Sequence, residues 1–263
     1  MNNKKFFITL LFFLISPLFF ISSYSAYSAE TITIRSDNWM PYNGDPSDKN
    51  PGYIIELLKE IYKPYTITID YQIVPFTRAL KETREGKSNA VIGVYKEDAP
   101  DFIFPNEPLC FGQDGFFALK EQKTNWSFKD ADSVANVKIG CASEYAYSDE
   151  KIIQAMKKYP ASFDCIKGED PLQTNIKKLL NKRIVAILEN RSVMNWMIAK
   201  MNLQDKIIWA TAVETINTPM FIAFSPKSSK SKDLAKKFDL GIKKLQENGV
   251  MKELQKKYQI QLK

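Results

Sequence analysis

The strongest constraint on the fold is an alternation of strand-like and helical segments that occurs twice along the chain. In the first half these segments fall in turn at residues 31–36, 53–62, 66–74, 77–86, 89–95 and 115–120. In the second half they fall at 136–141, 149–159, 162–166, 173–182, 183–190, 192–201, 205–210 and 220–225. This order produces mostly parallel sheets covered by helices on both faces. Because the order starts again midway, we predict two α/β lobes rather than one wide sheet.

The first 29 residues have the layout of a cleaved signal peptide. Lys4 and Lys5 precede an almost unbroken apolar run from Phe6 to Ile21, and small residues follow as far as Ala29. The run is shorter than the ~20 residues that span a bilayer, although a membrane anchor is the alternative. No cysteine follows the run closely enough to carry a lipid. We therefore predict an exported, unanchored protein beginning near Glu30.

Histidine and cysteine usage narrows the chemistry. The chain has no histidine, which excludes Ser-His-Asp and Cys-His catalysis and removes the commonest zinc ligand. We expect no metal and no cofactor. Cys141 and Cys165 fall in successive strand-like segments, so neighbouring parallel strands would bring them together. In an oxidising compartment they would form a disulfide and leave Cys110 unpaired, with two buried thiols as the alternative.

The positive charge does not indicate a nucleic-acid ligand. The formal charge is +7, and removing Lys4 and Lys5 with the signal peptide lowers it to +5. Many of the remaining lysines lie in the last 40 residues at helical spacing, between apolar residues. They are typical of the solvated faces of amphipathic helices. We predict no nucleic-acid partner.

Polar and aromatic residues follow several of the predicted strands. Open parallel sheets bind ligands at the carboxyl ends of their strands. By this rule the candidate ligand-binding residues are Trp39, Tyr42, Phe76, Arg78, Tyr95, Glu144, Tyr145 and Asn190. Trp39 and Tyr42 lie in a loop that Pro41 and Gly44 keep irregular. We interpret these two rings as the wall of a site, with packing against the next helix as the alternative.

Several motifs in this order resemble a known family. They are WMPY after the first strand, PGY before the first helix, PFTRALKETREGKSNAVIGVY, FIFPNEPL, WSFKDADSVANVKIGCASEYAY, LLNKRIVAILENRSV and ENGVMKELQKKYQI. The set resembles the family 3 extracellular solute-binding proteins, which deliver amino acids and similar solutes to ABC importers from the periplasm. The resemblance covers essentially the whole chain after residue 29. Each motif is loose by itself, and their order is more specific.

The resemblance implies a type II periplasmic-binding-protein fold in which two α/β lobes are joined by two crossover strands. Lobe 1 would comprise residues 30–114 and 220–263, and lobe 2 residues 119–215. Hinges would lie near 114–118 and 216–220. It also implies a periplasmic monomer that clamps a small-molecule solute between its lobes and passes it to a membrane ABC permease.

Two positions depart from the pattern of amino-acid binders. The family usually has an Arg shortly after the strand that here ends at Tyr95, and this Arg grips the ligand carboxylate. Here residues 96–100 read KEDAP, without Arg. Asn190 stands where an Asp commonly receives the ligand ammonium, and Asn89 replaces another common Asp.

Arg78 is the best replacement cation for an anionic or zwitterionic solute, because it begins a helix directly after Phe76. The alternative is an exposed Arg78 paired with Glu82 one turn on. Glu144 could meet a ligand amine or remain a solvated loop carboxylate.

Three functions are compatible with the sequence. The first is a non-catalytic receptor for an amino acid or a related anionic or zwitterionic solute. The second is an exported enzyme on the same scaffold, similar to dehydratases that act on prephenate-like acids, with Glu144 or Glu189 as the acid. The third is a sensor subunit that reports ligand to a separate membrane chain. We favour the first.

Overall fold

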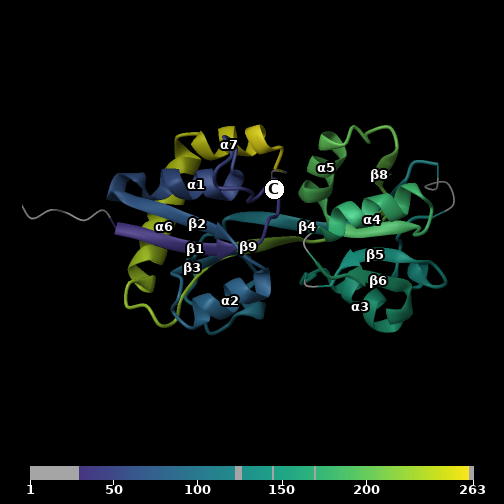
Figure 1. Ribbon diagram of the computed structural model, residues 1–263, viewed down its shortest axis with the longest axis horizontal. Helices are drawn as coiled ribbons and strands as arrows, with labels where there is room; N and C mark the ends of the chain where they lie inside the picture. Colours follow the sequence, from purple (N-terminus) through teal and green to yellow (C-terminus); the bar gives the residue numbers. More distant parts are fainter. Residues whose placement is uncertain (1–29, 122–125, 144, 169, 261–263) are drawn as a thin grey trace, which may run out of the picture.

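The computed structural model describes residues 30–121, 126–143, 145–168 and 170–260, so the predicted signal peptide lies outside the described residues. The described chain forms two α/β bodies side by side (Figure 1). Lobe 1 comes from both ends of the chain and lobe 2 from its middle. Among the described helices, none is long and apolar enough to cross a membrane.

Lobe 1 is a mostly parallel sheet with helices on both faces. Its elements are β1 (Glu30–Ser36), α1 (Tyr53–Tyr62), β2 (Ile67–Ile73), α2 (Phe76–Arg84), β3 (Ala90–Val94), α6 (Ser231–Glu247) and α7 (Val250–Tyr258). The strand β1 pairs in parallel with both β2 and β3. Helices α1, α6 and α7 lie on one side of this sheet and α2 on the other (Figure 1).

Lobe 2 repeats this architecture. Its elements are β5 (Ile139–Ala142), α3 (Glu150–Lys158), β6 (Phe163–Ile166), α4 (Pro171–Leu180), β7 (Ala186–Asn190), α5 (Arg191–Lys200) and β8 (Ile207–Trp209). The strand β5 pairs in parallel with β6 and β7. Helices α4 and α5 lie on the opposite side of the sheet from α3 (Figure 1). The predicted fold of two mostly parallel sheets flanked by helices is confirmed.

Two long strands, β4 (Cys110–Leu119) and β9 (Asn217–Phe224), run between the lobes. Cys110 to Gln113 of β4 pair with β9, and from Asp114 onward β4 pairs with β7 of lobe 2. At its other end β9 pairs with β3 of lobe 1. Both strands begin earlier than the sequence pattern predicts, at Cys110 rather than Gly115 and at Asn217 rather than Met220. The extra residues are the ones that pair across the junction.

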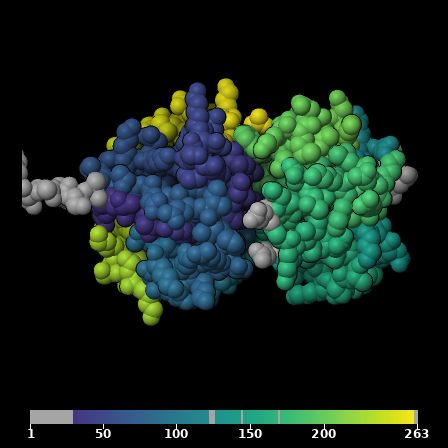
Figure 2. Space-filling view, viewed as in Figure 1, coloured from purple at the N-terminus to yellow at the C-terminus, as the bar shows by residue number. Residues whose placement is uncertain are grey.

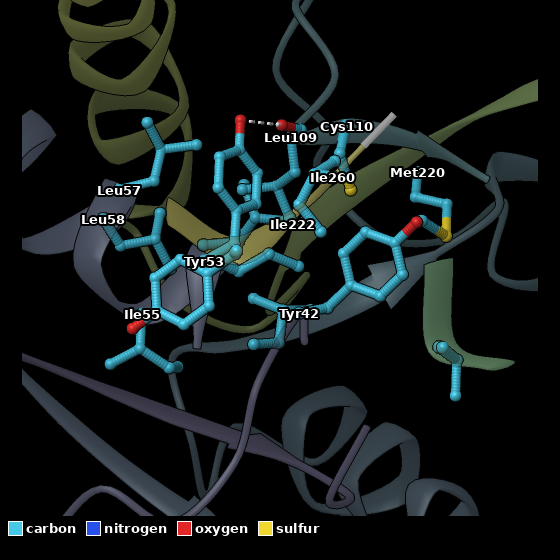
Figure 3. Packing of buried hydrophobic residues seen from close by; sticks show 14 of the residues in the cluster. Tyr42, Tyr53, Ile55, Leu57, Leu58, Leu109, Cys110, Met220, Ile222 and Ile260 are labelled. Carbon is cyan, nitrogen blue, oxygen red and sulfur yellow. Dashed lines mark hydrogen bonds between the residues drawn. The ribbon is translucent and has the colours of Figure 1, made fainter. Parts of the chain in front are cut away.

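The largest core cluster is built on α1. Ile54, Leu57, Leu58 and Ile61 of this helix are all at most 1% exposed, as their spacing along one helix face predicts. Each side chain contributes ~1.5–3 kcal/mol by burial. Figure 3 shows Tyr53 packed in this cluster, where its hydroxyl donates to the Leu109 carbonyl at 3.4 Å.

Cys141 and Cys165 lie opposite each other on the parallel strands β5 and β6 and form a disulfide, with Cα atoms 4.3 Å apart. Cys110 is a free, buried cysteine at the start of β4. The bond therefore fastens β6, the edge strand of lobe 2, to its neighbour.

We expect one free thiol per chain in the denatured, unreduced protein, because only Cys110 is unpaired. Titration with a thiol reagent in denaturant, with and without prior reduction, measures this number. The reduced sample provides the control of three thiols that the sequence requires. Three thiols without reduction would contradict the disulfide.

Candidate functional site

The two lobes meet along a seam (Figure 2), and a chamber lies between them. Its volume is about 50 Å³. The lining residues come from both lobes and from the crossover strands: Ser36, Asp37, Trp39, Phe76, Ile92, Gly93, Tyr95, Asp98, Asp114, Tyr145, Ala146, Tyr147, Glu189, Asn190 and Met220. We call this the inner chamber.

The loop after β1 places Trp39 in the chamber wall. The loop closes on itself, because the Trp39 amide donates to the Asn43 carbonyl at 2.7 Å and the Tyr42 amide to the Trp39 carbonyl at 2.9 Å. Tyr42 lies behind Trp39, with the two rings stacked at 4.6 Å. Tyr42 is fully buried and does not line the chamber. It supports the wall from the core, where Figure 3 shows it beside Met220.

Aromatic rings from both lobes face the chamber. Trp39 of lobe 1 meets Tyr145 of lobe 2 edge to face, with ring centroids 6.2 Å apart. Phe76, Tyr95 and Tyr147 complete the aromatic lining. Burial raises the pKa of the Tyr95 and Tyr147 hydroxyls, so both stay protonated and uncharged at neutral pH.

Two carboxyl groups are deeply buried in the chamber. Burial raises the pKa of Asp114 to about 7, and a hydrogen bond from the Ser148 backbone opposes this rise. Burial also raises the pKa of Glu189 to about 8, although its carboxylate accepts a 2.8 Å hydrogen bond from the Asn190 backbone amide. The charge of Asp114 adds to the shift of Glu189. Among the described residues, neither carboxyl group has a neighbouring cation that would hold it ionised.

The lining as a whole is acidic. Asp37 and Asp98 join Asp114 and Glu189, and burial raises the pKa of Asp98 as well. Among the residues that the structure describes around the inner chamber, none is Lys or Arg. The described chamber therefore has aromatic walls and gains negative charge as the pH rises through the pKa values of Asp114 and Glu189.

Asn190 lies at the junction of β7 and α5. Its Oδ1 caps the helix by accepting from the Ser192 amide at 3.0 Å, and it also accepts from the Tyr42 hydroxyl at 3.3 Å. Its Nδ2 makes no hydrogen bond of ordinary geometry, although it lies close enough to Asp114 to oppose the rise in the pKa of that group. Asn190 is therefore fixed by its oxygen, and its Nδ2 lies close to the Asp114 carboxyl group.

The predicted ligand-binding residues have different locations. Trp39, Phe76, Tyr95, Tyr145 and Asn190 come together at the inner chamber. Tyr42 belongs to the core, as the alternative reading of the sequence allowed, and Glu144 lies outside the described residues. Arg78 is absent from the described lining, and its Nε donates to Glu82 at 2.7 Å on the exposed face of α2. This arrangement is the alternative that the sequence left open for Arg78.

Sequence reasoning missed Asp37, Asp98 and Asp114 as site residues. It placed Glu189 beside Asn190 at a strand end, and gave it a role only as a possible enzyme acid. Asp37 directly follows β1, so the rule about strand ends could have found it. Asp114 lies inside β4, where the strand changes partner from β9 to β7. The family resemblance places a hinge near 114–118, but it does not mark Asp114 as a chamber residue, because that depends on how the two lobes are placed.

Two lobes, two crossover strands and a chamber between them define the class of protein: a two-lobed solute-binding fold. The model of the bacterial extracellular solute-binding proteins, family 3, matches residues 32–261. The chain belongs to this family. A search of curated protein sequences found no match.

Solved structures share the fold at low sequence identity. An ancestral arginine-binding protein bound to glutamine is 18% identical, with a TM-score of 0.68 over 88% of this chain and 99% of that one. An amino acid ABC transporter substrate-binding protein from Streptococcus pneumoniae, bound to L-arginine, is 16% identical, with a TM-score of 0.68 over 88% and 93% of the two chains. An ancestral amino-acid-binding protein, a precursor of cyclohexadienyl dehydratase, is 15% identical, with a TM-score of 0.67 over 87% and 95%.

Replacing Arg78 by Ala is expected to leave solute binding within about twofold, because its side chain pairs with Glu82 on the surface, outside the described lining. Losing this exposed pair should cost only ~0.3–0.5 kcal/mol of folding stability. The stabilisation of the protein against heat by its solute measures this. A loss of binding of tenfold or more would show that Arg78 turns into the chamber when solute is present.

Proposed function

We propose that this protein is an exported receptor that captures a small polar solute between its lobes and delivers it to an ABC importer. Membership of the solute-binding family supports a binding role. The observation that carries the proposal is the inner chamber, which is lined from both lobes and from both crossover strands. A ligand in this chamber touches both lobes at once.

The crossover strands provide the hinge for this function. Asp114 lies where β4 changes partner, and Met220 lies on β9 opposite Cys110. Both residues line the chamber. A solute that contacts both lobes favours the closed arrangement by its differential affinity, and a permease partner can read that arrangement.

The enzyme alternative has one feature in its favour, since Glu189 is a buried carboxyl group with a pKa raised to about 8. A protonated carboxyl group can act as a general acid. However, a prephenate-like substrate is an anion, and the described lining contains four carboxyl groups and neither Lys nor Arg. The described lining therefore offers such a substrate no cation, so we propose that the protein binds its solute and releases it unchanged.

Mass spectrometry of the gently purified protein tests this function. We expect a small organic molecule at about one per chain, released on denaturation and chemically unchanged after long incubation with refolded protein. Adding it back should raise the melting temperature and reduce the radius of gyration measured by small-angle X-ray scattering, because the lobes close. Absence of any stoichiometric molecule, together with no compaction by any tested solute, would contradict the receptor proposal.

A further inference from the structure

The charge of the inner chamber bears on the class of solute. Resting on the proposed receptor function, we propose that the solute is a small organic amine: a cation without a carboxylate, whose ammonium group lies in the inner chamber. The remaining atoms of the solute would extend into a larger cavity next to the inner chamber. This differs from the anionic or zwitterionic solute that the sequence suggests.

The Lys and Arg residues that are nearest in sequence to the lining residues make contacts outside the inner chamber. Lys96 lies over the Phe221 ring at 4.2 Å, and Arg35 pairs with Asp70 at 3.8 Å. Arg191 donates to Gln113 at 3.0 Å and lies over the Trp209 ring. With Arg78 held by Glu82, none of these groups is placed to bind a carboxylate in the inner chamber. A ligand carboxylate there would instead meet Asp114 and Glu189.

The aromatic lining independently favours an ammonium ion. A cation within ~6 Å of an aromatic ring is attracted by the negative face of the ring, and the attraction grows when water is excluded. Trp39 and Tyr145 present rings from opposite lobes, and Phe76, Tyr95 and Tyr147 line the same chamber. Rings and carboxylates together neutralise and desolvate an ammonium group, which neither feature does as well alone.

Two observations favour an organic cation over a metal ion. First, the described residues contain no group of three or more acidic or cysteine side chains that could hold a metal. The acids therefore surround the chamber without converging on one point. Second, one buried donor in the lining, Trp39 Nε1, has no hydrogen-bond partner among the described residues. It suits a neutral acceptor atom, such as a hydroxyl oxygen, on an organic ligand.

The rest of the cleft has room for the body of the ligand. A second cavity of about 500 Å³ adjoins the inner chamber and shares Asp37, Phe76 and Tyr145 with it. Its other walls include Ile73, Val74 and Pro75 from lobe 1 and Ile166 and Pro171 from lobe 2. The inner chamber has space for a few non-hydrogen atoms, since one water needs ~10–15 Å³. An ammonium head inside and an apolar body outside fit the two volumes.

Binding of such an amine should be coupled to proton release. The titratable groups that face Glu189 and Asp114 are Asp37, Tyr95, Asp98, Tyr145, Tyr147 and Asp149. All of these described groups are acids or phenols. Because an ammonium ion prefers ionised carboxylates, affinity should rise as the pH increases from about 6 to about 8.5. The ammonium itself stays charged over this range, since an alkylamine has a pKa of ~10.

Matched pairs of an amino acid and its decarboxylated amine provide the test. The pairs lysine and cadaverine, arginine and agmatine, and phenylalanine and phenethylamine differ within each pair only by the carboxylate. We expect at least one amine to stabilise the protein against heat and to bind at least tenfold more tightly than its parent amino acid. Its affinity should rise severalfold between about pH 6 and about pH 8.5.

The variants Glu189→Gln and Glu247→Gln test the location of the site. Glu247→Gln removes an exposed carboxylate at the end of α6 and should bind as the native protein does. Glu189→Gln should bind the amine at least tenfold more weakly and with a smaller pH dependence. If a parent amino acid binds as tightly as its amine or more tightly, the amine inference is wrong and the receptor function stands. If no pair member binds and no organic molecule co-purifies, both proposals fail.

Discussion

Replacing Glu189 by Gln is expected to stabilise the ligand-free protein at about pH 9. Glu189 is 2% exposed, and burial raises the pKa of its carboxyl group from 4.5 to about 8. At pH 9 the folded protein must therefore hold a buried negative charge. Gln has nearly the same shape, and its Oε1 can still accept from the Asn190 amide. The substitution removes the charge and keeps the hydrogen bond.

The direction of the pH dependence follows from proton linkage. Between about pH 4.5 and about pH 8 the folded state retains the proton of Glu189 and the unfolded state has lost it. The free energy of unfolding of the native protein should therefore fall as the pH rises through this window. Below it both states are protonated, and above it both are ionised, so the contribution of Glu189 is constant there.

The expected gain in the free energy of unfolding of Glu189→Gln is large for a single substitution. One unit of pKa corresponds to ~1.4 kcal/mol, and allowing for coupling with Asp114 we expect a gain of the order of 3 kcal/mol at about pH 9. For a chain of this length that is ~6–12 °C in melting temperature. Glu247→Gln should change the melting temperature by less than ~1 °C. A lower melting temperature for Glu189→Gln at this pH would show that the Glu189 carboxylate has a stabilising partner in the fold.

Replacing Gly52 by Ala is expected to be the most destabilising single-methyl addition near the site. Gly52 precedes α1 with φ 113° and ψ 154°, a region that is essentially restricted to glycine. A Cβ there would lie 2.6 Å from both the Asn43 Cα and the Tyr42 carbonyl oxygen. Both contacts are with backbone, which cannot move aside as a flexible side chain can.

The backbone that Gly52→Ala would displace belongs to the loop after β1, which carries Trp39 and Tyr42. At the N-terminus of α1 the Tyr53 amide donates to the Pro41 carbonyl at 2.9 Å, and the Ile54 amide to the Tyr42 carbonyl at 2.8 Å. These bonds replace a side-chain cap, which α1 lacks. Displacing the loop would break them and move Trp39, so Gly52→Ala should weaken solute binding as well as stability.

Urea unfolding measures the stability loss, which we expect to be ~4 kcal/mol or more from clash, strain and lost hydrogen bonds together. Gly249→Ala is the matched control. Gly249 also has a positive φ, 83°, but an added Cβ would meet nothing within 4 Å. It should cost only ~1 kcal/mol, the strain of the left-handed conformation. Equal losses in the two variants would show that the close approach of Gly52 to the loop has no energetic consequence.

Apolar spacing and turn residues predicted most helices and strands, because these elements are determined largely by interactions between residues close together in the sequence. The spacing in α1 predicts its buried face, and Gly86 has the φ of 81° expected after a helix end. The pairing of Cys141 with Cys165 follows from two successive strand signals. The extra residues at the starts of β4 and β9 were not predictable, because they are strand only through pairing between segments about a hundred positions apart.

The site was predictable only in part, for the same reason. The rule about strand ends finds Trp39, Tyr95 and Asn190, which lie at or just beyond such ends. It also selects Arg78, because sequence cannot show whether a helical side chain turns toward the cleft or toward Glu82. The acidic character of the chamber arises from Asp114 of β4 and Glu189 of β7, which depend on the placement of the two lobes. The residues after single strands therefore suggest an anionic or zwitterionic solute, whereas the lining as a whole leads us to propose an amine.

The most direct measurement of the central claim, that the solute binds between the lobes, is calorimetric titration of the released solute. It should be performed on the native protein, Glu189→Gln and Glu247→Gln at about pH 8. We predict one site per chain, unchanged affinity for Glu247→Gln, and at least tenfold weaker binding for Glu189→Gln despite its greater stability. Equal affinities for all three proteins would place the solute outside the inner chamber and contradict the claim.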